Sequence, residues 1–300
     1  MTTIEELKQK IATVNDLRSV VKTMKSLAAV SIHQYEKAVE SLSEYDRTLE
    51  MGWQILLQKH PERLLEESTH QTQNVGLIVF GSDWGMCGRF NEQIAEYTQK
   101  YLSYPGIKSD SSPILSIGTK IGDCVASRRH RLEVMGYNCE AKFNLPSSVT
   151  GITAMVQEIV LNLETWREQN RVERIIIIYN RIISGTTYRP TRLQIFPLNS
   201  KWLRKLKQKK WSSKCVPTFT MEEDKLAAAL FEQYFFVSLY RACAESLKSE
   251  NTSRLAAMQT AEKNIAERLT ELNMQFNQQR QTTITEELLD IVAGFEALNE

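Results

Sequence analysis

The 300-residue sequence is poor in the side chains that build metal and redox centres. Its four histidines are scattered, and no Cys-x-x-Cys pair occurs, so the sequence predicts no metal site and no cofactor. The cysteines are odd in number and widely spaced, a pattern typical of reduced thiols in a cytosolic protein, with a regulatory disulfide as the alternative. They are Cys87, Cys124, Cys139, Cys215 and Cys243.

Long apolar runs and a charge excess are also missing. No stretch of 18 apolar residues occurs, and residues 1–10 lack the apolar core of a secretory signal. The formal net charge of +1 gives no general basis for binding nucleic acid or a lipid surface. We therefore expect no nucleic-acid partner, and membrane association only through other proteins.

Residues 221–300 contain no proline, and their only glycine is Gly294. Apolar residues recur at helical spacing from Leu226 to Leu298, and the charged and amide residues between them exclude a membrane span. At 1.5 Å per residue, a helix of this length extends roughly 110 Å. Because it is longer than a compact domain of this chain, its apolar stripe must be covered by something else.

A second long helix is predicted over Thr2–Leu57, begun by a capping box of Thr3 and Glu6. On a seven-residue frame, one series of inward positions is apolar throughout, whereas charges interrupt the other. The apolar series is Leu7, Val14, Val21, Ala28, Tyr35, Leu42 and Leu49, and the interruptions are Arg18, Lys25 and Asp46. We expect an imperfect coiled coil in which the two terminal helices pair antiparallel.

The middle of the chain changes its apolar period. Alternating short strands and helices predict βαβ crossovers, hence a Rossmann-like α/β domain with a mostly parallel sheet. The expected strands are Val75–Phe80, Ile114–Ile117, Glu140–Asn144, Arg174–Asn180 and, at the sheet edge, Arg192–Pro197; the expected helices are Asn91–Tyr104, Ile121–Met135 and Thr153–Gln169. The predicted domains are therefore residues 1–60, 74–198 and 221–300, with a linker at 62–73 and the first and last forming one discontinuous coiled coil.

Lys201–Lys214 is the one strongly biased segment, with seven basic residues and two tryptophans. A solvated connector is the simplest interpretation. The alternative is a contact with an acidic partner surface or with lipid headgroups.

The glycine-rich segment Gly81–Asn91 follows the first predicted strand, where α/β folds place their ligand loops. It matches neither a Walker loop nor the Gly-x-Gly-x-x-Gly spacing. We interpret it as a tight structural turn, in which the important residues are Gly81, Asp83, Gly85, Cys87 and Gly88. An enzyme with Ser82, Asp83 or Cys87 in a pocket at the carboxyl ends of the strands is the alternative, and a coiled-coil adaptor displaying the α/β domain is another.

Three blocks of the chain resemble the gamma subunit of F-type ATP synthases. Lys22–Ala29 (KTMKSLAA) is similar to the family's K-A-M-K-M-V-A-A, and Gly81–Asn91 (GSDWGMCGRFN) to its S-D-R-G-L-C-G-G-L-N. The third block runs without gaps from Glu245 to Leu298 and includes Arg254–Met258 (RLAAM). Ser26, Trp84, Arg89 and Asn251 depart from the family pattern, and Leu17–Trp53 resembles the alternative N-type branch of these ATPases.

The resemblance implies a non-catalytic rotor subunit without a nucleotide site. Its coiled coil would enter a ring of three alpha and three beta subunits, and its α/β domain would meet the epsilon subunit and the membrane ring of c subunits. Ion flow, of H⁺ or Na⁺, would turn the rotor and couple transport to ATP synthesis or hydrolysis. The complex would lie peripherally on the cytoplasmic face of a bacterial inner or thylakoid membrane. By the same resemblance, the subunit contacts are Met24, Lys25, Arg254, Arg280, Gln281, Thr285 and Glu287.

Overall fold

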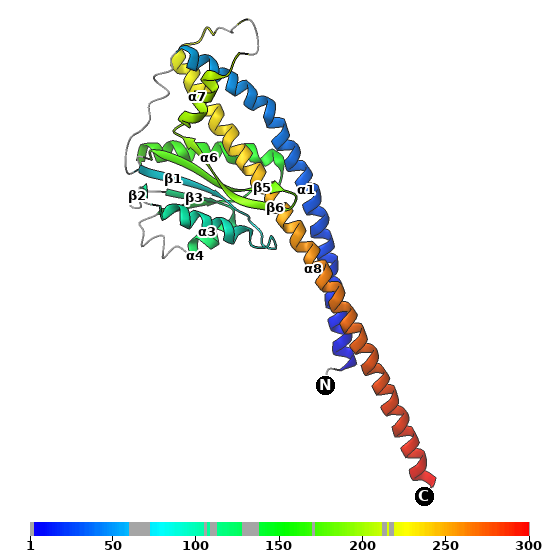
Figure 1. Cartoon of the computed structure of the whole chain (residues 1–300). Helices are drawn as coiled ribbons and strands as arrows, with labels where there is room; N and C mark the ends of the chain where they lie inside the picture. Colours follow the sequence, from blue (N-terminus) through cyan, green and yellow to red (C-terminus); the bar gives the residue numbers. More distant parts are fainter. Residues whose placement is uncertain are drawn as a thin grey trace. The chain divides into compact units, whose positions relative to one another are not determined.

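The computed structural model of the chain (Figure 1) contains two compact units. The coiled-coil unit is Met1–Ala29 with Arg254–Glu300, and the α/β unit is Val30–Ser253. The division cuts both long helices, whereas the domains predicted from the sequence end where the helices end. The structure describes residues 3–59, 73–104, 107–108, 113–127, 138–169, 172–211, 215 and 219–299, so that nearly all of the predicted linker lies outside it.

The described elements follow the order expected for an α/β domain between two long helices. They are α1 (Ile4–Lys59), β1 (Gln73–Phe80), α3 (Phe90–Leu102), β2 (Ile107–Lys108), β3 (Pro113–Ile117), α4 (Thr119–Ser127), β4 (Asn138–Phe143), α6 (Val149–Gln169), β5 (Arg174–Ser184), β6 (Thr187–Phe196), α7 (Ser200–Gln208) and α8 (Glu223–Asn299). The predicted end of the helix at Met135 lies outside the described residues.

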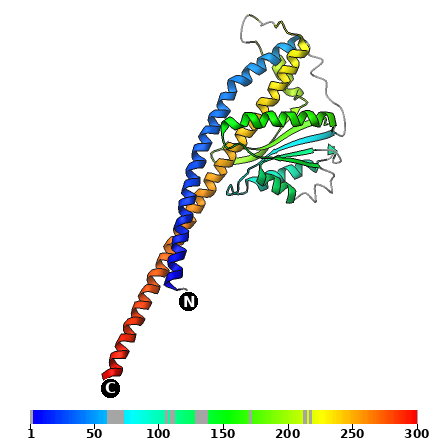
Figure 2. The same ribbon diagram turned by 180° about the vertical axis from the view of Figure 1, so that it is seen from behind.

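The sheet of the α/β unit has the strand order β4-β3-β1-β5-β6, and the short β2 pairs with the start of β1. All described pairings are parallel except that of β5 with the edge strand β6, so the predicted mostly parallel sheet is confirmed. One face packs on α3 and α4; α6 and the part of α8 in this unit cover the other (Figure 2). The central residues of β1 and β5 are apolar on both sides of the strand, and the helices on the two faces bury them.

The β5–β6 pair extends further than the sequence predicts. The predicted strands stop at Asn180 and resume at Arg192, whereas the hairpin continues to a turn at Gly185, whose φ is +53°. Burial explains the difference, because β5 is buried up to Asn180 and largely exposed beyond it. An apolar run detects only the buried half of such a strand.

In the coiled-coil unit, the first turns of α1 pack antiparallel on α8. Lys25 Nζ lies 2.7 Å from Glu262 Oε2, whereas Val14, nearer the start of α1, lies with Leu272, further along α8. The helix begins with the predicted capping box, since Thr3 and Glu6 exchange two hydrogen bonds of 3.3 Å.

The same pairing direction holds inside the α/β unit. Glu36 Oε1 lies 2.7 Å from Lys248 Nζ, and Asp46 forms an ion pair with Arg241. Every position of the apolar series from Leu7 to Leu49 is buried or half-buried, as predicted. Two of the charges that interrupt the other series, Lys25 and Asp46, form ion pairs with α8. Each of these two charges is therefore balanced by an opposite charge on the facing helix.

The basic segment is a helix for much of its length, not a plain connector. The side chain of Asn199 accepts hydrogen bonds from the backbone of Lys201 and Trp202 and so caps the start of α7. Leu203 and Leu206 are buried in a cluster with Trp53 of α1, while the lysines of α7 face solvent. The apolar stripe of α7 consists only of Leu203, Leu206 and Trp202, so it is not evident in a sequence segment dominated by basic residues.

We expect the Lys25–Glu262 pair to make the stability of the chain depend on pH. The hydrogen bond from Lys25 and its positive charge lower the pKa of Glu262 from the ordinary value of 4.5. A carboxyl with a lowered pKa stabilises the fold above its unfolded-state pKa and loses that contribution as the pH falls through the folded-state value. In thermal melts, Lys25→Gln should therefore melt below the wild type at pH 7, and the difference should shrink as the pH falls below 4.5 and through the lowered pKa of Glu262. A melting difference that persists unchanged at pH 3 would show that this ion pair is not the cause.

Candidate functional site

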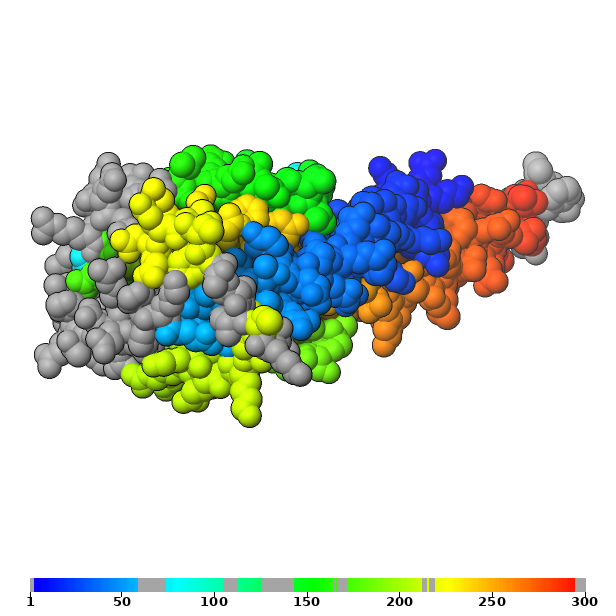
Figure 3. Space-filling model, turned by 90° about the horizontal axis from the view of Figure 1, so that it is seen from above, coloured from blue at the N-terminus to red at the C-terminus, as the bar shows by residue number. Residues whose placement is uncertain are grey.

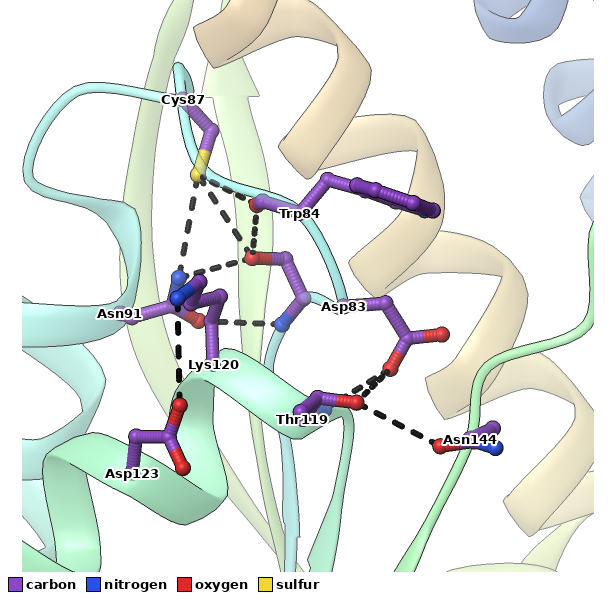
Figure 4. Close-up of polar contacts among 9 residues, drawn as sticks. Asp83, Trp84, Cys87, Asn91, Thr119, Lys120, Asp123 and Asn144 are labelled. Atoms are coloured by element: carbon purple, nitrogen blue, oxygen red, sulfur yellow. Dashed lines mark hydrogen bonds and ion pairs between the residues drawn. The ribbon is translucent and has the colours of Figure 1, made fainter.

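The loop between β1 and α3 lies at the carboxyl edge of the parallel strands and holds the predicted turn residues (Figure 4). Gly81 is required by close approach, because a Cβ there would lie 2.2 Å from the Cβ of Ile121. Gly88 has a φ of +59°, which favours glycine, whereas Gly85 has open space around it. Met86, at φ +60°, is a second left-handed residue that the sequence did not reveal.

Asp83 ties together the ends of three strands. Its Oδ1 accepts hydrogen bonds from the backbone nitrogen of Thr119 at 2.8 Å and from the Thr119 hydroxyl at 3.1 Å. Its other oxygen accepts from the backbone nitrogen of Leu145 at 2.7 Å. Thr119 is also the first residue of α4, so the carboxylate lies at a helix N-terminus, where negative charge is favoured. The carboxylate thus joins the loop to the segments that follow β3 and β4.

A second, buried cluster holds the inside of the loop. Asn91 Oδ1 accepts from the backbone nitrogen of Ser82 at 3.0 Å, and its Nδ2 donates to the Ser82 hydroxyl at 2.7 Å. That hydroxyl donates to the carbonyl of Trp84 at 2.8 Å, and the Cys87 sulfur lies 3.6 Å from it. The side chains of Ser82 and Cys87 are buried, while the Trp84 ring is 75% exposed.

The loop and β5 are fastened to α8 by serine hydroxyls. Ser253 Oγ donates to the carbonyl of Cys87 at 2.7 Å, and Ser249 Oγ lies 3.0 Å from the carbonyl of Asn180. Asn180 Nδ2 in turn donates to the carbonyl of Phe90 at 3.2 Å. The polar residues of α8 from Ser249 to Ser253 are buried, so this part of the helix binds the sheet through hydrogen bonds rather than through apolar packing.

This geometry favours a structural role of the loop over the catalytic alternative. Ser82 and Cys87 have their polar atoms inside the loop, and three donors bind the Asp83 carboxylate, which leaves none of the candidate nucleophiles presented to a substrate. Moreover, a cavity of about 580 Å³ in the α/β unit lies at the amino end of β5, beside Arg174, and not at the carboxyl ends where the enzyme alternative predicts a pocket.

Among the residues that the structure describes, no group of three or more His, Cys, Asp or Glu side chains is arranged to hold a metal ion. None of the described helices is long and apolar enough to cross a membrane. Of the described cysteines, Cys87 and Cys243 are buried, Cys124 is half-buried and Cys215 is exposed, and burial raises the pKa of Cys243.

We expect Asp83→Ala to destabilise the α/β unit. The substitution leaves two backbone N–H groups and a hydroxyl without their acceptor, and hydrogen bonds to a charged group contribute about 1.5–3 kcal/mol each. Because Asp83 is half-exposed, water can replace part of these hydrogen bonds. We therefore expect a loss of about 2–3 kcal/mol in the free energy of unfolding, measured in urea titrations. Asp123→Ala, which removes an exposed carboxylate of α4 near Lys120, is the control and should change it by less than about 0.5 kcal/mol. Equal effects of the two substitutions would contradict the bridging role.

The predicted subunit contacts lie in the coiled-coil unit, where the parts of α1 and α8 run side by side (Figure 3). Met24 and Lys25 are half-buried, and Lys25 is held by Glu262 of the same chain. Arg254 is half-buried as well. The remaining members are exposed along the last turns of α8; they are Arg280, Gln281, Thr285 and Glu287.

Large apolar side chains accompany these exposed residues. On α8, Leu288 is 58% exposed and Leu289 62%, and on α1, Leu27 is 62% exposed. Large exposed apolar side chains in this number are candidates for protein contacts. They recur along both helices, at Leu17, Val20, Leu27, Met274, Ile284, Leu288, Leu289, Ile291 and Val292.

Several residues of the loop site were not found by reasoning from the sequence. Thr119, Asn180 and Ser253 contact the loop from distant parts of the chain, and Ser249 contacts Asn180 of β5. The only available signal was the run of small polar residues within the C-terminal helix, where an apolar stripe was expected. Asn91 lies inside the quoted block, but its hydrogen bonds depend on the turn that brings it back to Ser82.

The fold and the loop define the class of protein by two parts: a coiled-coil unit formed by the two ends of the chain, and an α/β unit whose described loop has its polar side chains engaged in internal hydrogen bonds. Comparison with known proteins identifies the family. The family model described as "ATP synthase" matches residues 3–298, so the chain belongs to this ATP synthase family. The resemblance to its gamma chains noted in the sequence is thereby confirmed.

Individual relatives agree with this assignment. The chain is 27% identical over 249 residues to the ATP synthase gamma chain of Buchnera aphidicola, covering 77% of this chain and 76% of that one. It is 26% identical over 234 residues to the gamma chain of Ehrlichia canis, covering 77% of each. Among solved structures, a chain of the Euglena gracilis mitochondrial ATP synthase superposes with a TM-score of 0.66 at 18% identity, covering 98% of this chain and 94% of that one. This last likeness shows the fold.

Proposed function

We propose that this chain is the central rotor subunit of an F-type ATP synthase. Its coiled coil turns inside the ring of alpha and beta subunits, and its α/β unit contacts the epsilon subunit and the c ring. Rotation couples ion flow through the c ring to ATP synthesis or hydrolysis in the beta subunits. The observation that carries the proposal is the family match across residues 3–298, which includes both helices of the coiled coil.

The exposed surface of the coiled-coil unit supports this role. A shaft that turns in a bearing needs contacts that form and release, so a strong interface at any one angle is unfavourable. The last turns of α8 combine exposed apolar residues such as Leu288 with the exposed polar residues Arg280, Gln281 and Glu287. We assign these residues, with Met24, Lys25, Arg254 and Thr285, to contacts with the surrounding subunits.

The α/β unit supports transmission of torque rather than catalysis. The ties from Asp83 and Ser253 hold the sheet to α8 through a loop whose polar groups are internally satisfied. We infer that the chain is a non-enzymatic part of the complex, placed peripherally on the cytoplasmic face of a bacterial membrane. Its resemblance to the N-type branch stays a prediction.

Reconstitution tests the proposal. The chain is expressed with alpha, beta and epsilon subunits from the same genome, and the complex is isolated through a tag on beta. We expect this chain to co-purify as one copy per three beta subunits and to be required for ATP-driven ion pumping into vesicles with the membrane sector added. An active pump assembled without this chain would exclude the rotor role, and co-purification without any effect on pumping would favour the adaptor alternative.

A further inference from the structure

The cavity in the α/β unit has the size and wall of a small-molecule site. Its volume of about 580 Å³ lies within the range of about 300–1,000 Å³ usual for ligand pockets. Helices α1, α7 and α8 and strands β5 and β6 all contribute to the wall. The side chains that the argument uses are three aromatic and three cationic ones: Tyr101, Trp202, Tyr234, Arg174, Arg192 and Arg241.

The negative charges in the wall are already matched by cations. Asp46 forms its ion pair with Arg241, and Glu50 lies 2.9 Å from Lys209 Nζ. Two of the three arginines, Arg174 and Arg192, are left over. Among the residues that the structure describes, neither has a carboxylate within ion-pair distance. The cavity therefore carries an unbalanced positive charge of two guanidinium groups.

The geometry of these two arginines suits an anion. The Nε of Arg174 is buried and lacks a hydrogen-bond partner within the described part of the chain, which costs free energy unless a ligand accepts from it. The guanidinium carbon of Arg192 lies 5.2 Å from the centre of the Tyr101 ring. Contact with the ring face leaves the N–H groups, which lie in the guanidinium plane, available to an acceptor.

We propose that this cavity binds a phosphate-bearing ligand through Arg174 and Arg192. The planar, five-donor guanidinium group matches the oxygens of a phosphate group with two parallel hydrogen bonds, so two arginines can bind several oxygens of one phosphate monoester or diester. The rings of Trp202 and Tyr234, whose centres are 5.7 Å apart, form an apolar wall for the organic part of a phosphate ester. The proposal is independent of the rotor function.

Two sources share this chemistry, a soluble phosphate ester and a phospholipid headgroup. Trp202 belongs to both the cavity wall and α7, whose lysines are exposed, so an anionic membrane surface and a free anion are each attracted to this side of the unit. The ligand arms of the experiment separate the two sources.

The test measures binding to the purified full-length chain by titration calorimetry at low salt. The soluble probes are inorganic phosphate and phenyl phosphate, and the lipid probes are vesicles of phosphatidylglycerol compared with vesicles of phosphatidylcholine. Arg192→Gln should weaken binding at least about tenfold, or about 1.4 kcal/mol. The matched control is Arg189→Gln, an exposed arginine of the same strand that does not line the cavity, which should weaken it less than about twofold. Circular dichroism melts of both variants verify folding.

Each outcome decides the proposal. Binding of phenyl phosphate that depends on Arg192 supports a soluble ester, and binding of phosphatidylglycerol vesicles alone that depends on Arg192 supports a lipid headgroup. Absence of binding in every arm overturns the proposal. Equal weakening by Arg189→Gln and Arg192→Gln also overturns it, because binding would then follow the general charge of β6 and not the cavity.

Discussion

Arg280→Ala is expected to reduce ATP-driven ion pumping by about tenfold in the reconstituted complex, while assembly is retained. Arg280 is exposed on the last turns of α8, so its removal does not disturb the packing of the coiled coil. In the proposed rotor it makes a charge-assisted hydrogen bond to the surrounding ring, worth about 1.5–3 kcal/mol when sheltered from water. Loss of about 1.4 kcal/mol at the step that couples rotor angle to the catalytic sites corresponds to a tenfold change in rate.

The matched control is Arg268→Ala on the same helix. Arg268 is also exposed, but its Nη1 lies 2.8 Å from Glu271 Oε2, one turn along α8, so its charge is satisfied within the chain. An exposed pair of this kind contributes little, and pumping should stay within about twofold of the wild type. The measurement is the rate of ATP-driven acidification, or of sodium uptake, in vesicles containing equal amounts of assembled complex. Equal pumping by the two variants would remove Arg280 from the coupling surface.

Gly81→Ala is expected to cost about 3 kcal/mol in the free energy of unfolding, a large share of the stability of a typical domain. The added Cβ would lie 2.2 Å from the Cβ of Ile121 and 2.8 Å from Asn91 Oδ1. The Cβ of Ile121 is fixed to the backbone of α4, so it cannot swing away as the end of a flexible side chain can. The strand end and the helix must therefore separate, which also breaks the hydrogen bonds of Asn91 with Ser82.

Gly85→Ala is the internal control for this substitution. It adds the same methyl group four residues later in the loop, where no atom lies within 4 Å of the new Cβ. Its free energy of unfolding should stay within about 0.5 kcal/mol of the wild type in urea titrations. Similar losses for both variants would mean that flexibility of the loop, and not the close approach to α4, is what requires glycine.

Much of this fold follows from local sequence patterns. Residues 221–300 lack proline and contain glycine only at position 294, which predicts α8. A seven-residue frame predicts which face of α1 is buried, because helix geometry repeats the same spacing along the whole element. The buried strands β1 and β5 stand out as apolar runs. The capping box at Thr3 has a local signature as well, since its two partners are three residues apart.

What escaped prediction depends on long-range contacts. The loop residue Asp83 was recognised as important for the turn. The residues that donate hydrogen bonds to its carboxylate, Thr119 and Leu145, are 36 and 62 residues away along the chain. In the sequence, the serines of α8 interrupt an apolar stripe. In the fold, their hydroxyls donate to backbone carbonyls of β5 and of the loop. The ion pairs of Lys25 and Asp46 likewise appear as defects of the seam until the opposite helix supplies Glu262 and Arg241.

The most direct test of the rotor proposal is a rotation measurement on the complex of this chain with alpha and beta subunits. The ring is fixed to a surface through beta, and a bead is attached to α7 through Lys205→Cys in a Cys215→Ser background, since both residues are exposed. With ATP present, we predict rotation of the bead in one direction with three pauses per turn, one for each beta subunit. A stationary bead on a complex that continues to hydrolyse ATP would contradict the proposal.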